Sequence, residues 1–212
     1  MDLLMFPKGM LFGLSVAAPV GPIAVLTIRR TIGDGFRMGF ATGLGAATAD
    51  ATYGLIAALG LTAIMSALTS HADLIRLAGG VMLLVIGLRA LLQARSHAGT
   101  DARNVADVPS AKSAYMQAVG LTLTNPMTVL VFIALFAGIG IHGEGANNAD
   151  AAVLVVGVAL GSALWWLVLV QLVTRVRHRL SGRAVRLIDL ASSFVIAGFG
   201  VAAIVATGYA WQ

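Results

Sequence analysis

The sequence has no cysteine and few charged residues. Of its 212 residues, only 11% are Asp, Glu, Lys or Arg, whereas 58% are hydrophobic. Without cysteine the chain has no disulfide, no thiolate metal site and no thiol–disulfide carrier chemistry. Charges are also nearly absent from several windows that are too long for the helices or strands of a soluble domain. The composition therefore predicts a membrane protein.

The sequence also lacks the usual patterns of nucleic-acid binding and of enzymes. Its formal net charge is +5, and in a membrane protein such an excess records orientation and contact with anionic lipid, so we expect no nucleic-acid partner. No two of the four histidines have the spacing of metal ligands, and HExxH, GxSxG and GxxxxGK[ST] motifs are absent. We therefore expect no metal, no cofactor and no catalytic residue.

Six windows are long and apolar enough to be membrane spans. They are predicted at about residues 8–28, 38–63, 74–92, 114–141, 151–174 and 190–209. The predicted fold class is an all-α polytopic membrane protein with a single membrane domain over residues 1–212. A polar, alanine- and serine-rich segment at about 93–113 reads as a cytoplasmic linker between one half at about 1–92 and another at about 114–212. Each half has three spans, and because three is odd the halves enter the membrane from opposite sides, as in an inverted repeat.

Short spacings recur in the two predicted halves. Lys8 precedes Pro22 by fourteen residues, and Lys112 precedes Pro126 by the same number. A pair of glycines four residues apart occurs in the second span and again in the fifth, at Gly39 and Gly43 and at Gly157 and Gly161. Small residues are common in membrane helices, so the repeat rests on these matches together.

The distribution of basic residues predicts the orientation. Twelve of the fourteen Lys and Arg residues flank the first, third and fifth connections between spans. Cytoplasmic loops retain such residues, so both termini are predicted to lie on the extracytoplasmic side.

The second span contains a carboxylate at mid-helix. At 100° per residue Asp50 falls on a stripe of small residues, with Tyr53 just beside it. Glycines on such a stripe favour close helix packing, and Asp50 could simply hydrogen-bond a neighbouring helix. An aspartate at this depth costs about 2.5 to 3.5 kcal/mol on insertion scales, however, so we favour a function. A proton or a cationic group of a substrate can neutralise it, and exchange of one for the other is what antiport requires.

Prolines break two of the predicted spans near the middle. Pro19 and Pro22 flank Gly21 in the first span, and Asn125 precedes Pro126 in the fourth. Each proline removes an amide donor and frees a carbonyl one turn earlier, and such a kink can serve packing alone. Broken helices at corresponding places in two halves are, however, typical of a central binding site. We therefore expect both breaks, Asp50 and Tyr53 to line one cavity, where helix ends could meet a substrate's carboxylate and ammonium groups.

The run from Ala18 to Leu61 resembles the LysE/RhtB family of amino-acid exporters. The residues that carry the resemblance are Pro19, Gly21, Pro22, Gly35, Gly39, Gly43, Gly45, Asp50 and Gly60, together with Asn125 and Pro126 in the fourth span. The resemblance implies secondary export of amino acids or related cationic metabolites across the bacterial inner membrane, driven by the proton gradient. Its candidate substrates are basic or small polar amino acids, such as lysine, arginine, threonine or homoserine, and small inorganic cations also remain open.

Three other classes of protein stay open at this point. A non-transporting scaffold subunit would use its glycine faces to bind other spans, and exposed glycine faces are also compatible with a homodimer. A channel could line its path with small residues and one carboxylate. An intramembrane enzyme is disfavoured because no second catalytic group accompanies Asp50.

Overall fold

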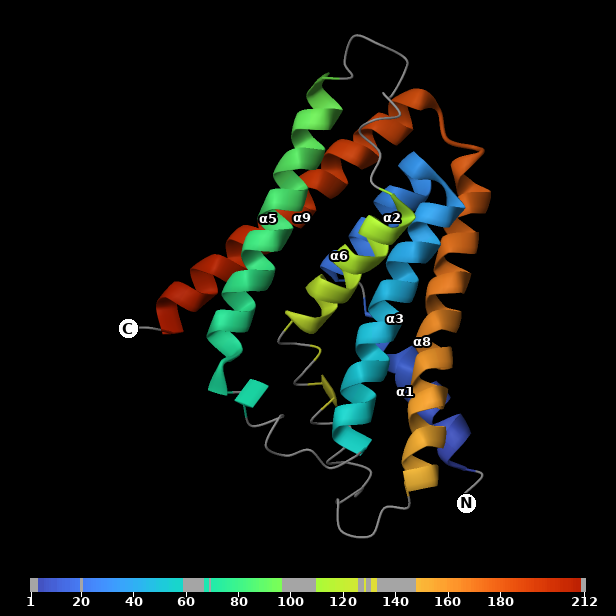
Figure 1. The fold of residues 1–212 in the computed structure, drawn as a ribbon. Coiled ribbons are helices and arrows are strands. Elements are labelled where there is room, and N and C mark those ends of the chain that lie inside the picture. The colour runs from blue at the N-terminus through green and yellow to red at the C-terminus, as the bar shows by residue number, and fades with distance from the viewer. Residues whose placement is uncertain are drawn as a thin grey trace.

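The structure, a computed structural model, is all-helical in the part of the chain that it describes. It describes residues 4–19, 21–58, 67–68, 70–96, 110–125, 128, 131–132 and 148–210. The main helices are α1 (Met5–Ala17), α2 (Pro22–Asp34), α3 (Phe36–Ala58), α5 (Ala72–Ser96), α6 (Ala111–Leu123), α8 (Asn148–Arg177) and α9 (Gly182–Ala210) (Figure 1). Most of the predicted linker, Pro126 and most of the remaining fourth span lie outside the described residues.

Within the described residues, three helices are long and apolar enough to cross a membrane, namely α5, α8 and α9, and the bent pair of α1 and α2 would make a fourth span if it counts as one. The predicted class of helical membrane protein is therefore confirmed. The helix α3 does not meet the same criterion, because glycines, threonines and Asp50 reduce its apolar character, and α6 has only 13 residues. The structure thus supports fewer spans by this measure than the six predicted.

The first predicted span is two helices rather than one. The axes of α1 and α2 differ by 81°. The helix α1 ends with the amide of Ala18 bonded to the Leu14 carbonyl at 3.0 Å, and α2 begins at Pro22 after Gly21 in extended backbone. Proline is favoured at the first helical position because an N–H at that position would have no acceptor within the helix, so its absence costs nothing. The break therefore occurs where the prolines predict it, and it is larger than a kink.

A glycine makes the sharp turn from α2 into α3. Gly35 has a φ of 91°, the only positive φ among the described residues. A side chain strongly disfavours this conformation, whereas glycine adopts it readily. The turn lets α2 fold back against α3.

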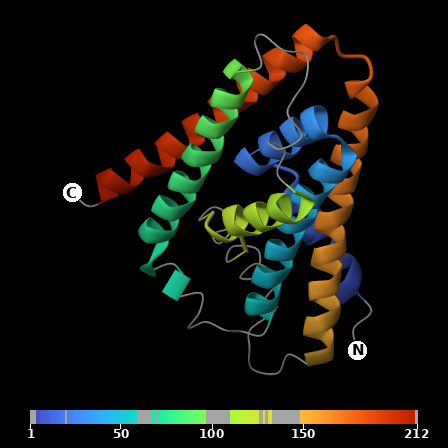
Figure 2. The same cartoon turned by 45° about the horizontal axis from the view of Figure 1, so that its top comes forward.

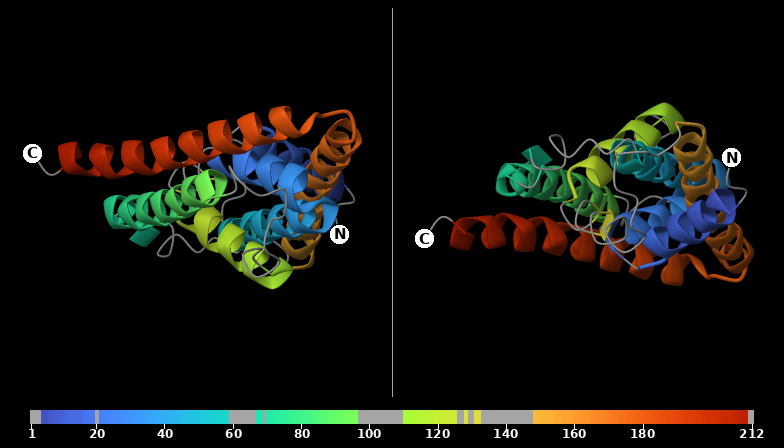
Figure 3. Two further views of the ribbon diagram at one scale, coloured as in Figure 1. Left: turned by 90° about the horizontal axis from the view of Figure 1, so that it is seen from above. Right: turned by 90° about the horizontal axis from the view of Figure 1, so that it is seen from below.

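The helices pack as two groups with α2 between them. In one group α8 packs against α1 and α3, and α6 packs on α3; in the other, α5 and α9 lie side by side. The helix α2 contacts α3, α8 and α9. Figure 2 shows α5 and α9 diverging from the first group, and the two views in Figure 3 show their far ends projecting beyond it. The break between α1 and α2 thus lies between the two groups.

Glycines allow the closest helix contacts. A Cβ atom built on Gly43 of α3 would lie only 2.5 Å from the Trp166 Cβ of α8, which is too close, whereas one on Gly54 would meet Val158 at an ordinary contact distance of 3.5 Å. Membrane helices approach closely through small residues of this kind. The glycines of the α3 stripe therefore serve packing, which is the role that the sequence favoured for them.

Two arginines of α2 tie the groups together. Arg29 Nε lies 2.7 Å from Asp189 Oδ1 at the start of α9, in a largely buried ion pair. Arg30 is 4% exposed. It donates hydrogen bonds to acceptors on α3 and α6, namely Thr42 Oγ1 at 3.0 Å, the Ala114 carbonyl at 3.2 Å and Gln117 Oε1. The guanidinium groups therefore fix one end of α2 against three other helices.

Replacing Arg30 by methionine is expected to lower the stability of the folded protein. Methionine fills much of the same space, but it leaves Gln117 Oε1 and the Ala114 carbonyl without the donor that they share. Hydrogen bonds that involve a charged group contribute about 1.5 to 3 kcal/mol. Thermal unfolding in detergent should show the loss, whereas Arg37→Met, at an exposed position of α3, should unfold within the error of the native chain. Equal melting of the two variants would contradict the structural role of Arg30.

Candidate functional site

Asp50 is buried in the middle of α3 and faces α8. It is 3% exposed, and Ser162 Oγ of α8 donates a hydrogen bond to its Oδ2 at 2.7 Å. In the described part of the chain no cationic side chain pairs with Asp50. A buried carboxylate without a cation is costly unless something else neutralises it. The local structure therefore leaves Asp50 able to bind a proton or an external cation.

A small cavity of about 70 Å³ lies beside Asp50. Its lining includes Asp50, Pro19, Gly21 and Pro22 at the break between α1 and α2, and Asn125 just after the end of α6. A cavity this small has room for a few waters or for one ammonium group, but it is well below the size of the usual ligand pocket. Five of the predicted site residues are thus brought together around a space that fits the polar head of a substrate.

Two other polar side chains on this wall lack a hydrogen-bond partner in the part of the chain that the structure describes. Thr122 Oγ1 and Trp166 Nε1 are buried and make no hydrogen bond within the described residues, and both residues line the small cavity. Buried polar atoms normally find a protein or water partner. Water or a polar group of a ligand in the cavity would supply these partners.

Tyr53 lies away from the small cavity. Its hydroxyl donates a hydrogen bond to the Leu123 carbonyl at 2.6 Å, and its ring packs at 5.7 Å from that of Phe132. The Leu123 carbonyl belongs to the last turn of α6, where helix carbonyls lack a helical donor. Tyr53 therefore caps the end of α6 from α3, and the structure does not place it among the described residues that line either cavity. Pro126, the remaining predicted site residue, lies outside the described residues.

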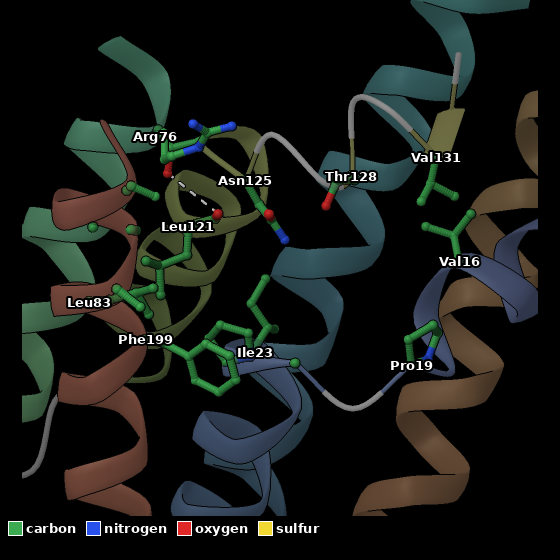
Figure 4. Close-up of a pocket in the computed structure, with 18 residues that line it drawn as sticks. Val16, Pro19, Ile23, Arg76, Leu83, Leu121, Asn125, Thr128, Val131 and Phe199 are labelled. Carbon is green, nitrogen blue, oxygen red and sulfur yellow. Dashed lines mark hydrogen bonds between the residues drawn. The ribbon is translucent and has the colours of Figure 1, made fainter. Parts of the chain in front are cut away.

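A larger cavity of about 530 Å³ adjoins the small one. The two share part of their lining, including Pro19, Gly21, Pro22 and Asn125. In Figure 4 the Asn125 amide points into the space between Ile23 and Thr128. The first half of α5 and the last part of α9 supply the opposite wall, with Arg76 at one end. Its volume is that of a pocket for a small organic molecule.

Ser162 and Arg76 are site residues that the sequence did not single out. Ser162 is the only hydroxyl residue between residues 151 and 170, so a lone polar group in an apolar span was the available signal. Arg76 falls at a predicted membrane interface, where arginine is expected for other reasons. Its place at a cavity depends on how α5 packs against α6 and α9, and the sequence carries no direct sign of that.

The combined site has one carboxylate and one guanidinium. Among the described residues that line the two cavities, Asp50 is the only acid and Arg76 the only base. Acid–base catalysis usually needs a second titratable group near the first. A single carboxylate beside an interrupted helix instead suits the binding and release of a cation or a proton.

Comparison with known proteins gives a family. Residues 14–207 match the family model described as LysE type translocator. The chain is 28% identical over 161 residues to the "Putative amino acid efflux protein YcgF" of Bacillus subtilis (strain 168), which covers 76% of each chain. It is 25% identical over 189 residues to the "Uncharacterized membrane protein YrhP" of the same organism, covering 85% of this chain and 89% of that one. No solved structure matches.

Proposed function

The chain belongs to the LysE type translocator family, and from this membership and the geometry of the site we propose that it exports amino acids in exchange for protons. A translocator is not an enzyme, which agrees with a site that offers one carboxylate. The B. subtilis relative named for amino acid efflux supports an amino acid as the cargo. The observation that carries the mechanism is the place of Asp50, unpaired by any described cation, at a cavity lined by the break between α1 and α2 and by Asn125 after the end of α6.

Asp50 is proposed to bind the substrate ammonium and a proton in alternation. The small cavity has room for one of them beside the carboxylate, and its other polar groups, Thr122 Oγ1 and Trp166 Nε1, have no partner within the described residues. Binding one cation while excluding the other couples the two fluxes. The protein cannot change between its two access states with Asp50 charged and unpaired, because burying a bare carboxylate carries a large desolvation cost. Pro19, Gly21, Pro22 and Asn125 form the wall that would move when access changes from one side to the other.

The pairing of helices supports an inverted repeat within the proposed six-span fold. The first helix of each half packs on the second helix of the other half, since α1 contacts α8 and α6 contacts α3. The remaining equivalent helices pair with each other, α3 with α8 and α5 with α9. A twofold axis between the halves, lying in the membrane plane, would produce this exchange of partners.

The basic connections gather at one end of the molecule, which we propose is cytoplasmic. Figure 1 shows the α2–α3 turn, the α8–α9 turn and the end of α5 at the top of the view. Arg29 and Arg177 lie near this end, where Arg29 pairs with Asp189 and Arg177 approaches Gly35. The positive-inside rule then places both termini outside the cytoplasm, in the bacterial inner membrane. A homodimer stays a prediction.

Flux from proteoliposomes tests the proposed function. Vesicles that contain the purified chain and a labelled amino acid should release it faster when an inward proton gradient is imposed, and the rate should saturate with substrate. Saturation separates a carrier from a channel, and collapse of the pH gradient with an ionophore is the control. Release equal to that of protein-free vesicles for every amino acid tested would favour the scaffold alternative and overturn the proposal.

A further inference from the structure

We propose that the ion pair between Arg29 of α2 and Asp189 of α9 is the inner gate of the carrier, and that it is closed in this structure. This inference rests on the proposed function, because a carrier must close its site to one side at a time. It goes beyond that function in naming the contact that breaks before a substrate enters from the cytoplasm. The inner end is the one proposed to be cytoplasmic, where the α2–α3 turn lies.

The large cavity occupies the outer half of the molecule. Its described lining comes from the first half of α5, the second half of α9 and the end of α6, together with both sides of the break between α1 and α2. Figure 1 shows these parts of α5, α9 and α6 directed away from the end that carries the α2–α3 and α8–α9 turns. In Figure 4, Arg76 lies at one end of the cavity and Ile23, at the start of α2, lies toward the other. On the inner side the cavity therefore ends at α2.

Packed side chains close the inner half of the interface between α2 and α9. Leu26 of α2 and Ile196 of α9 belong to one cluster of buried residues, and both are 0% exposed. Ser193, one turn nearer the inner end of α9, is also 0% exposed. By contrast Phe199, on the wall of the large cavity, is 40% exposed. A solute in the cavity therefore meets two helices in contact, and it passes inward along this interface only if they separate.

The pair of Arg29 and Asp189 lies at the inner end of this interface. Arg29 Nε and Asp189 Oδ1 are 2.7 Å apart, and the two side chains are only 11% and 14% exposed. A pair this far from bulk water keeps most of its attraction, and removing one partner leaves the other charge buried and uncompensated. When the two helices separate, water can hydrate both groups and replace the lost contact. Such a pair can therefore hold the inner end closed and still release it.

The two neighbouring arginines attach α2 to different parts of the molecule. Arg30 donates hydrogen bonds to α3 and α6, at Thr42 and Gln117, so it keeps α2 within the first group of helices. Arg29 reaches α9 instead, and besides α5 the described helix that α9 packs against most is α2. Loss of the Arg29 pair would therefore release α9, together with α5, and leave the first group intact. This is the arrangement of two bodies that rock against each other around a site.

The sequence contains one short motif twice, with its charges exchanged. Residues 73–78 of α5 read Asp-Leu-Ile-Arg-Leu-Ala, and residues 186–191 of α9 read Arg-Leu-Ile-Asp-Leu-Ala. In the proposed inverted repeat Arg76, near the outer end, thus corresponds to Asp189, near the inner end. Among the described residues Arg76 pairs with Asp73 on its own helix, whereas Asp189 pairs with a different helix. Equivalent positions therefore differ as expected if the inner end is closed and the outer end is not.

The accessibility of an introduced cysteine tests the gate. The native chain has no cysteine, so Ser193→Cys supplies a single thiol of nearly the same size behind the ion pair. In inside-out vesicles a membrane-impermeant maleimide should label this thiol slowly, because the closed interface excludes the reagent. With Asp189→Asn added, labelling should become about tenfold faster, since the charge-assisted contact that favours the closed state is lost. A factor of ten in this equilibrium corresponds to about 1.4 kcal/mol.

Two controls separate opening of the gate from a general loosening of the protein. Val16→Cys places the thiol on the outer side of α2, since Val16 lines both cavities. Its labelling in right-side-out vesicles should not become faster with Asp189→Asn, because a shift toward the inward-open state depletes the outward-open one. Asp73→Asn makes the same change in the equivalent motif of α5 and breaks the pair with Arg76. It should leave the labelling of Ser193→Cys as it is in the otherwise native chain.

Three results would overturn the gate. They are unchanged labelling of Ser193→Cys with Asp189→Asn, faster labelling of both thiols, and equal acceleration by Asp73→Asn. If Asp189→Asn cannot be purified, Arg29→Gln breaks the same pair from the other side and is judged by the same results. Labelling needs no transport, so the two proposals fail separately. Native vesicles that release no amino acid would contradict the proposed function, whereas unchanged labelling would remove the gate and leave amino-acid export intact.

Discussion

Replacing Asp50 by asparagine is expected to abolish amino-acid export driven by a proton gradient. Asparagine has nearly the same shape, and its amide oxygen can still accept the hydrogen bond from Ser162 Oγ. It cannot take up a proton or carry a negative charge, so the variant loses its coupling group. Affinity for the ammonium group should fall about ten- to a hundredfold, since hydrogen bonds to charged groups contribute about 1.5 to 3 kcal/mol. Labelled efflux from proteoliposomes, with and without a pH gradient, measures both effects.

The neighbour of Asp50 provides the matched control. Ser162→Ala removes the same hydrogen bond from the other side and keeps the carboxylate, so export should persist with altered affinity and remain sensitive to the gradient. Both variants should melt near the native chain in detergent. If Asp50→Asn exports at the native rate, the carboxylate is a packing residue. If both variants lose export equally, the hydrogen bond rather than the charge is what matters.

Much of this site could be predicted from the sequence because its charged and helix-breaking residues have a large free-energy cost inside a membrane. A carboxylate at mid-span and prolines inside apolar windows stand out against the lipid-like residues around them. The structure brings Asp50, Asn125 and the residues of the first break around one cavity. The role of Tyr53 could not be predicted, because its hydroxyl could equally have faced the cavity or the carbonyl of Leu123 that it bonds.

Ser162 could not be singled out from the sequence, because a serine is tolerated in a membrane helix without any functional reason. A serine in a membrane helix can bond its own backbone, so nothing local distinguishes Ser162 as the partner of Asp50. In the predicted repeat, where Gly39 corresponds to Gly157, the residue equivalent to Asp50 is Val168, which is exposed on α8. The contact with Ser162 instead depends on how α3 crosses α8. Partners of this kind follow from tertiary packing, which hydropathy and spacing do not determine.

The bounds of the membrane helices were only partly predictable from the sequence. Charge-free length correctly located α5, α8 and most of α9. It also placed the start of the last helix at about residue 190, whereas α9 begins at Gly182 and includes Arg183 and Arg186. Basic residues end an apolar window but not a helix, because arginine is a good helix former. Hydropathy therefore measured the apolar part of that helix and missed its first two turns.

Replacing Gly161 by valine is expected to prevent stable folding. A Cβ atom at Gly161 would collide with the Met10 carbonyl oxygen of α1 and would lie 2.9 Å from that residue's Cα and carbonyl carbon. On the facing helix, Gly13 meets the Val158 carbonyl oxygen in the same way, so neither backbone can move aside locally. Overpacking usually costs about 1 to 3 kcal/mol, and here the obstacle is backbone rather than a side chain that could adopt another rotamer. Loss of a monodisperse peak in detergent chromatography measures the effect.

The same substitution at Gly198 separates this collision from any general effect of valine in a membrane helix. Gly198 lies on an exposed face of α9, and a Cβ atom there would have no heavy atom within 4 Å. Both changes remove a helical glycine and add the same three carbons, so the propensity and apolar contributions are matched. Gly198→Val should therefore purify and melt as the native chain does. Because Ser162 follows Gly161 directly, a folded Gly161→Val chain should also have a displaced Asp50 and reduced export. Normal folding and export in that variant would show that α1 and α8 are not in contact as the structure has them.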